Sequence, residues 1–154
     1  MGASEISTKH QRIALPNVEA TAALAHRLAD GAARGDVFGL SGPLGAGKTT
    51  FARAFIGEIA RLSGETVDEV PSPTFTLVQT YSFARASVWH FDLYRIGKPP
   101  EAWELGLEDA LADGISLIEW PERLGPLLPA KRIDVALSHG ATPEARIADI
   151  SAHG

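Results

Sequence analysis

Gly42-Pro43-Leu44-Gly45-Ala46-Gly47-Lys48-Thr49 fits the pattern G-x-x-x-x-G-K-[ST] at every position. Glycines at these places let the backbone fold into a ring of inward-facing N–H groups, which side chains would obstruct. Lys48 is long enough to reach the β- and γ-phosphates of a nucleotide, and the Thr49 hydroxyl is a suitable Mg²⁺ ligand. A chance match is expected in about one chain in two hundred of this length. We therefore interpret residues 42–50, which end at Thr50, as a loop that binds the phosphates of ATP together with Mg²⁺.

The segments on either side of the loop fit this interpretation. Residues 36–41, DVFGLS, form a short apolar run that is typical of a buried strand. Residues 49–62 are predicted to be a helix, because apolar residues recur along one side at Phe51, Phe55, Ile59 and Leu62. A strand, a glycine loop and a helix in this order place the positive end of the helix against the phosphates.

The rest of the chain predicts further strands and helices in alternation. The other expected elements are a strand at 12–15, a helix at 18–30, strands at 74–83 and 87–96, a helix at 100–111, a strand at 115–120, a helical turn at 124–128 and a hairpin of 133–137 with 145–150. Apolar strands interleaved with helices predict an α/β fold, here a single P-loop NTPase-like domain with a mixed sheet flanked by helices. The 154 residues suit one domain, with residues 1–9 expected to be a flexible N-terminus.

Composition narrows the classes of function. The absence of cysteine excludes a disulfide partner and a thiolate zinc site. No run approaches the ~20 apolar residues of a membrane span, and the N-terminus lacks the apolar core of a secretory signal, so we expect a cytoplasmic protein with no membrane contact. The net charge of −5 and the scattered basic residues argue against direct binding of nucleic acid.

Two carboxylates are candidates for the second half of a nucleotide site. Asp92 lies on the polar side of an alternating strand and could hold Mg²⁺, but a solvated carboxylate on a half-exposed strand has the same pattern. Glu119 follows a mostly apolar run, at the edge where α/β sheets bind ligands. It could order the attacking water or the magnesium shell, or be a charge at the exit of the strand. The spacing alone leaves both alternatives open.

Two other residues have both a functional and a structural interpretation. Thr74, in the proline-stiffened SPTF segment, could sense a γ-phosphate as GTPase switch threonines do, or simply lead a turn into a strand. Trp120 could stack on a ligand or partner, or pack in the core. His90 is interpreted as a packed strand histidine. The acidic residues Glu101, Glu104, Glu108 and Asp109 are expected to form a solvated helix face.

Taken together in chain order, these segments resemble the TsaE family of bacterial P-loop ATPases. The segments are GPLGAGKTTFAR at 42–53, SPTFTLVQTY at 72–81, HFDLYRI at 90–96, ELGLED at 104–109 and IEWPERL at 118–124. The resemblance implies one α/β domain that hydrolyses ATP in partnership with the proteins TsaB and TsaD. That system places threonylcarbamoyl on adenosine 37 of tRNAs that read ANN codons. The resemblance also implies that TsaE does not form that bond, and that tRNA is contacted only through the complex.

The resemblance assigns roles to individual residues. Lys48 and Thr49 match the phosphate and magnesium ligands, and Asp92 and Glu119 match the motif carboxylates that act in catalysis and on the metal. Thr74 matches a switch-like threonine. The other residues expected to contact the nucleotide are Gly42, Pro43, Leu44, Gly45, Ala46, Gly47, Thr50 and Trp120. Pro43 departs from the family pattern, since many relatives carry an acidic residue there.

Two other functions compete with the partner-dependent ATPase. One is a small-molecule P-loop kinase, which would need an acceptor pocket and an arginine-bearing lid that the sequence does not show. The other is a nucleotide-gated binding module, in which bound ATP only sets the shape of the 72–80 segment. No arginine stands out as a finger, so we predict slow hydrolysis by the isolated chain and faster hydrolysis with partners.

Overall fold

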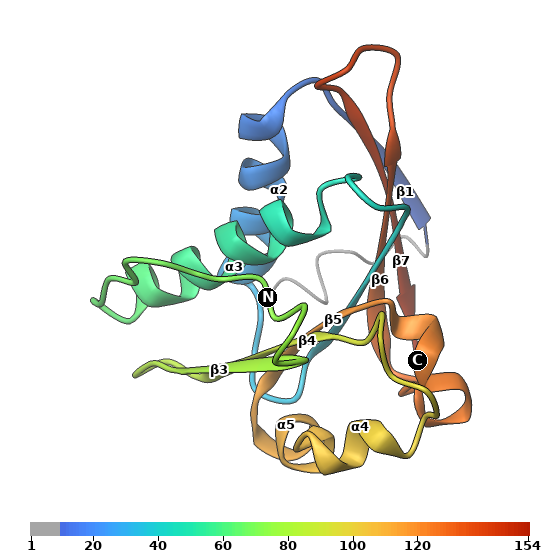
Figure 1. Cartoon of the computed structure of the whole chain (residues 1–154). Helices are drawn as coiled ribbons and strands as arrows, with labels where there is room; N and C mark the ends of the chain where they lie inside the picture. The colour runs from blue at the N-terminus through green and yellow to red at the C-terminus, as the bar shows by residue number, and fades with distance from the viewer. Residues whose placement is uncertain (1–9) are drawn as a thin grey trace.

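The computed structural model describes residues 10–154, and Figure 1 shows the arrangement of its elements. In chain order the elements are β1 (His10–Leu15), α2 (Val18–Asp30), β2 (Val37–Ser41), α3 (Lys48–Leu62), β3 (Val78–Ser82), β4 (Ser87–Asp92), α4 (Glu101–Glu104), α5 (Leu107–Asp113), β5 (Ile115–Glu119), the 3-10 helix η1 (Pro121–Leu127), β6 (Arg132–His139) and β7 (Arg146–His153). The expected flexible segment at 1–9 lies outside the described residues. None of the helices from residue 10 onward is both long and apolar enough to cross a membrane.

The strands form one mixed sheet in the order β1-β7-β6-β2-β5-β4-β3. Strand β2 is parallel to both of its neighbours, β5 and β6, and β5 is also parallel to β4. The outer strands β1 and β3 and the strand β7 pair antiparallel with their neighbours. Because four central strands run in one direction, the carboxyl ends of β2, β4 and β5 meet at the same edge of the sheet.

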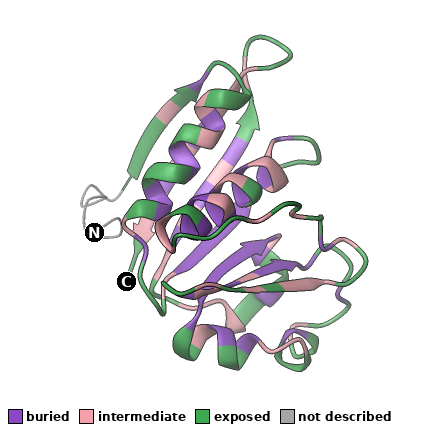
Figure 2. Cartoon of the chain, turned by 90° about the vertical axis from the view of Figure 1, so that its left-hand side faces the viewer, coloured by how far each residue is buried: buried purple, intermediate pink, exposed green. Residues whose placement is uncertain are grey.

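Helices cover both faces of this sheet. One apolar cluster joins α2 and α3 to alternate residues of the central strands, and the rings of Phe38 and Phe55 meet edge to face at 5.0 Å in it. The neighbouring residues point the other way: Val37 and Ile118 pack with α4 and α5 in a second cluster. Figure 2 shows the buried residues concentrated in the strands and on the inner sides of the helices. The predicted α/β fold, with a mixed sheet flanked by helices, is confirmed.

Helix α2 begins and ends where it was predicted to, because residues next to each end determine its limits. The Asn17 side chain accepts a hydrogen bond from the backbone N–H of Ala20 at 2.9 Å, which caps the first turn. Glu19 lies in that turn, and the helix ends at Gly31. The expected solvated acidic face is also confirmed, since Glu101, Glu104, Glu108 and Asp109 are all exposed.

Three predicted elements differ from the observed ones: two strands are shorter and one helix is interrupted. Residues 74–77 form a turn rather than the start of a strand, and Leu77 has a φ of +69° there. Strand β4 ends at Asp92, whose carboxylate accepts the N–H of Tyr94 at 3.1 Å and so turns the chain. The helix expected at 100–111 is two short helices separated at Gly106, which has a φ of +96° and lies against the ring of Trp89.

Candidate functional site

The loop between β2 and α3 has the backbone that its glycines predict. Gly42, Gly45 and Gly47 have φ values of +137°, +78° and +104°, which L-residues with a side chain rarely adopt. A Cβ on Gly42 would also collide with the backbone carbonyl oxygen of Leu137 in β6. The loop therefore turns sharply out of the sheet and ends at Lys48, where α3 begins.

A hollow of about 250 Å³ opens beside the start of α3. Its lining comes from the loop, the first turn of α3, the segment before β3, and the carboxyl ends of β4 and β5: Leu44, Gly45, Gly47, Lys48, Thr49, Thr50, Ser72, Thr74, Asp92, Glu119 and Trp120. Three predicted residues do not line it: Gly42 and Pro43, whose carbonyl oxygens accept hydrogen bonds from Lys48, and Ala46, which is buried. The other predicted site residues are brought together at one edge of the sheet.

Lys48 is folded back onto the loop. Its Nζ donates to the carbonyl oxygens of Gly42 and Pro43 at 2.5 and 3.0 Å, and lies 4.3 Å from the centre of the Trp120 ring. Burial lowers the pKa of the Lys48 ammonium below the ordinary lysine value, while nearby carboxylates, Glu119 foremost, oppose this effect. The side chain is only 5% exposed, so its charge is shielded from bulk water.

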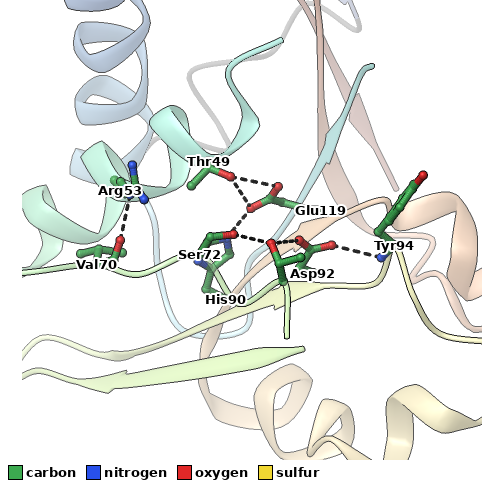
Figure 3. A network of polar contacts seen from close by, with 9 residues as sticks. Thr49, Arg53, Val70, Ser72, His90, Asp92, Tyr94 and Glu119 are labelled. Atoms are coloured by element: carbon green, nitrogen blue, oxygen red, sulfur yellow. Dashed lines mark hydrogen bonds and ion pairs between the residues drawn. The ribbon is translucent and has the colours of Figure 1, made fainter. Parts of the chain in front are cut away.

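The two candidate carboxylates lie side by side. Asp92 and Glu119 are register partners on β4 and β5, and they are 6% and 3% exposed. The Thr49 hydroxyl lies 3.4 Å from both carboxylate oxygens of Glu119 (Figure 3). The Thr74 hydroxyl lies 3.4 Å from Asp92 Oδ2. The alternative of a solvated Asp92 on a half-exposed strand is therefore excluded.

The oxygen donors of the hollow suit one kind of metal site. Residues 10–154 contain no group of three or more His, Asp or Glu that could hold a metal ion alone. Mg²⁺ does not need such a group, because it is usually held by one or two carboxylates together with waters and substrate phosphates. Asp92, Glu119 and the Thr49 hydroxyl provide that donor set, so the residues fit Mg²⁺ that arrives with a nucleotide.

Trp120 has an unusual backbone conformation for its residue type. Its φ is +60° and its ψ is +52°, and its ring lies 4.9 Å from the ring of Tyr94. A large residue in the left-handed region is strained, and such strain is concentrated at functional sites. The conformation places the indole beside Lys48, at the rim of the hollow.

Sequence reasoning missed three contributions to the site. The Ser72 hydroxyl lies 2.8 Å from that of Thr74, and its place two residues earlier in the same proline-rich segment was an available signal. His90 was interpreted only as a packed histidine, yet its Nε2 lies 2.6 Å from Glu119 Oε2. Arg146, at the start of β7, donates to the Gly45 carbonyl at 3.1 Å, and no local pattern indicates that contact.

A parallel strand, a G-x-x-x-x-G-K-T loop and a helix in succession are the arrangement of the P-loop class of α/β proteins. The model of the family described as "Threonylcarbamoyl adenosine biosynthesis protein TsaE" matches residues 15–147. The chain belongs to the TsaE family.

Individual relatives agree with this assignment. A protein from Rickettsia felis named "tRNA threonylcarbamoyladenosine biosynthesis protein TsaE" is 43% identical over 123 residues, which are 80% of this chain and 70% of that protein. The protein of the same name from Bacillus subtilis is 36% identical over 135 residues, 85% of this chain and 79% of the relative. The crystal structure of Bacillus subtilis YdiB is similar with a TM-score of 0.76 at 30% identity, covering 95% of this chain and 87% of that one.

Proposed function

We propose that this chain is a Mg²⁺-dependent ATPase that works with TsaB and TsaD in forming threonylcarbamoyladenosine at position 37 of tRNAs that read ANN codons. The observation that carries the proposal is the convergence of Lys48, Thr49, Asp92 and Glu119 on one hollow at the carboxyl edge of the sheet. This convergence occurs in a chain whose family is named for threonylcarbamoyl adenosine biosynthesis.

The chain's own groups are suited to hold a triphosphate. Backbone N–H groups of the glycine loop and of the first turn of α3 attract anions, and the helix dipole adds to that attraction. Lys48 would exchange the carbonyls of Gly42 and Pro43 for phosphate oxygens, which are stronger partners for an ammonium. When bound, Mg²⁺ would supply charge neutralisation at the phosphates, with Thr49, Asp92 and Glu119 as the residues that hold it or its waters.

Hydrolysis would depend on positioning and electrostatics. Glu119 is buried and oriented by neighbouring side chains, so its carboxylate can order an attacking water. No arginine lines the hollow among residues 10–154. Related GTPases without an arginine finger turn over at only about 10⁻⁴ s⁻¹. We therefore expect slow hydrolysis by the isolated chain, and faster hydrolysis where TsaB and TsaD complete the site.

Substitution of Lys48 tests the nucleotide site. In titration calorimetry with Mg²⁺ and ATP, Lys48→Ala should bind about 10- to 100-fold more weakly, because a charge-assisted contact worth about 1.5–3 kcal/mol is lost. Lys131→Ala, which removes an exposed lysine outside the hollow, is the matched control and should bind as the wild type does. Equal affinity of Lys48→Ala and wild type, with both folded, would refute the site.

Glu119→Gln separates the ATPase from a nucleotide-gated binding module. The variant keeps the shape of the side chain but removes its charge, so a hydrolysing enzyme should bind ATP and then stall. A binding module would support tRNA modification unchanged. Transfer of phosphate to a metabolite instead of water, followed with γ-labelled ATP, would instead indicate a small-molecule kinase.

A further inference from the structure

His90 lies beneath the candidate site in a fully buried position. It is on β4, two residues before Asp92 and on the same face of the sheet, and none of its surface is exposed. Its register partner on β5 is Leu117, and the ring reaches diagonally to the next residue on that face, Glu119. The Nε2 to Oε2 distance is 2.6 Å, and Figure 3 draws His90 among the polar contacts around Glu119.

Packing alone does not account for this histidine. The Nδ1 atom is buried and has no hydrogen-bond partner within residues 10–154, which costs about 1–3 kcal/mol. An apolar residue would fill the same space without that cost. What the imidazole adds is a short polar contact to a buried carboxylate, the only side-chain contact to Glu119 under 3 Å in the described part of the chain.

We propose that His90 is a positioning residue, whose Nε2–H holds Glu119 Oε2 and so fixes the orientation of that carboxylate in the nucleotide site. A glutamate side chain has several rotatable bonds, and the Thr49 contacts at 3.4 Å are too long to fix it alone. With Oε2 held against the sheet, Oε1 remains for water or a metal shell. The inference rests on the proposed role of Glu119.

Two substitutions at His90 separate positioning from packing. His90→Leu should lower the rate constant of ATP hydrolysis by about 10- to 100-fold, as loss of an outer partner of a site carboxylate does, while the nucleotide Kd stays unchanged. His90→Gln places an amide donor at similar reach and should recover most of that rate. Val88→Ala, a cavity-forming change on the same strand and face, controls for packing and should lower the Tm without lowering the rate.

A double-mutant cycle tests whether His90 acts through Glu119. In a Glu119→Gln background, the slow residual rate measured in single-turnover hydrolysis should fall little further on His90→Leu, because the carboxylate that His90 holds is already absent. An equal fractional loss in both backgrounds would overturn the proposal while leaving the ATPase assignment intact.

A measurement on the nucleotide-free protein is independent of hydrolysis. Nitrogen–proton correlation NMR, with the His90 signal assigned from its absence in His90→Gln, should find the proton on Nε2. A bare Nε2 would overturn the proposal, because it could not donate to the carboxylate. If the wild type hydrolyses no ATP, the proposed function fails, and this spectrum still decides whether His90 holds Glu119.

Discussion

Gly42 shows how much a single missing side chain matters in this loop. Its φ of +137° and the carbonyl of Leu137 leave no room for a Cβ, and the carbonyl belongs to the strand that pairs with β2. Gly42→Ala should therefore lower the free energy of unfolding by about 2–4 kcal/mol in urea denaturation.

Gly45→Ala is the matched comparison for that substitution. Gly45 also has a positive φ, +78°, but no atom lies within 4 Å of an added Cβ. The expected loss is only the backbone term of about 1–2 kcal/mol. A similar loss of unfolding free energy in the two variants would show that the close approach of Gly42 to β6 adds nothing to the cost of a side chain there.

The roles of single residues could be predicted best where a sequence motif is tied to one kind of chemistry. Lys48 and Thr49 follow from the glycine pattern, and the structure places both at the hollow. Asp92 could be proposed only from its place on the polar side of an alternating strand, and Glu119 only from its place at the end of an apolar run. The role of His90 could not be inferred, because it depends on a diagonal contact between two strands whose pairing is set by the whole sheet.

At the scale of elements, α3 anchors the segment that precedes β3. Arg53 Nε donates to the carbonyl oxygen of Val70 at 2.8 Å, which ties this helix to the chain that carries Ser72 and Thr74. Arg53→Ala should speed amide hydrogen exchange in residues 68–77 while leaving the exchange of α3 unchanged. Arg27→Ala, on the exposed side of α2, is the control. Unchanged exchange in 68–77 would mean that other contacts hold the segment.

Asp30 at the end of α2 and Glu58 in α3 form a pair of carboxylates whose effects on the stability of the fold change in opposite directions with pH. The Arg61 guanidinium lowers the pKa of Glu58 to about 2, so ionised Glu58 stabilises the fold above its ordinary pKa of about 4.5, and this stabilisation is lost as the pH falls toward 2. The hydrogen bond with Glu58 raises the pKa of Asp30, so ionised Asp30 destabilises the fold at neutral pH and this cost fades on acidification.

Substitution of Asp30 tests these opposite signs. Asp30 is also the last residue of α2, where a negative charge opposes the helix dipole. Asp30→Asn should raise the free energy of unfolding at pH 7 by about 0.3–1 kcal/mol, and the gain should shrink at pH 4. Glu58→Gln should lower the free energy of unfolding at pH 7. A loss of stability in Asp30→Asn at pH 7 would contradict the assignment of the pair.

Element boundaries were predictable where the deciding interactions are local. The limits of α2 follow from Asn17 and Gly31, which act within one turn of the helix. The break at Gly106 was missed, because the ring that crowds this position belongs to Trp89, on a strand well before it in sequence. The end of β4 was also missed, although its signal is local: the Asp92 carboxylate accepts the backbone N–H of Tyr94 two residues on, and the alternating pattern of the strand hid this turn.

At the scale of the whole molecule, the order of the strands creates the candidate site. Strand β2 leads into the glycine loop, and its neighbour β5 ends at Glu119, so residues 70 positions apart, Thr49 and Glu119, come into contact. Alternation of apolar strands and helices predicted the fold class. The predicted hairpin of 133–137 with 145–150 is confirmed as the antiparallel pair β6–β7. The order of the central strands was not predicted, since many orders satisfy the same pattern.

The most direct test of the proposed ATPase is reconstituted threonylcarbamoyl transfer to tRNA with purified TsaB, TsaD and the activated threonylcarbamoyl donor. Wild-type chain should sustain multiple turnovers and consume ATP, whereas Lys48→Ala should support neither. Sustained turnover with Lys48→Ala, or none with a wild-type chain that binds ATP, would contradict a role for ATP hydrolysis by this chain in tRNA modification.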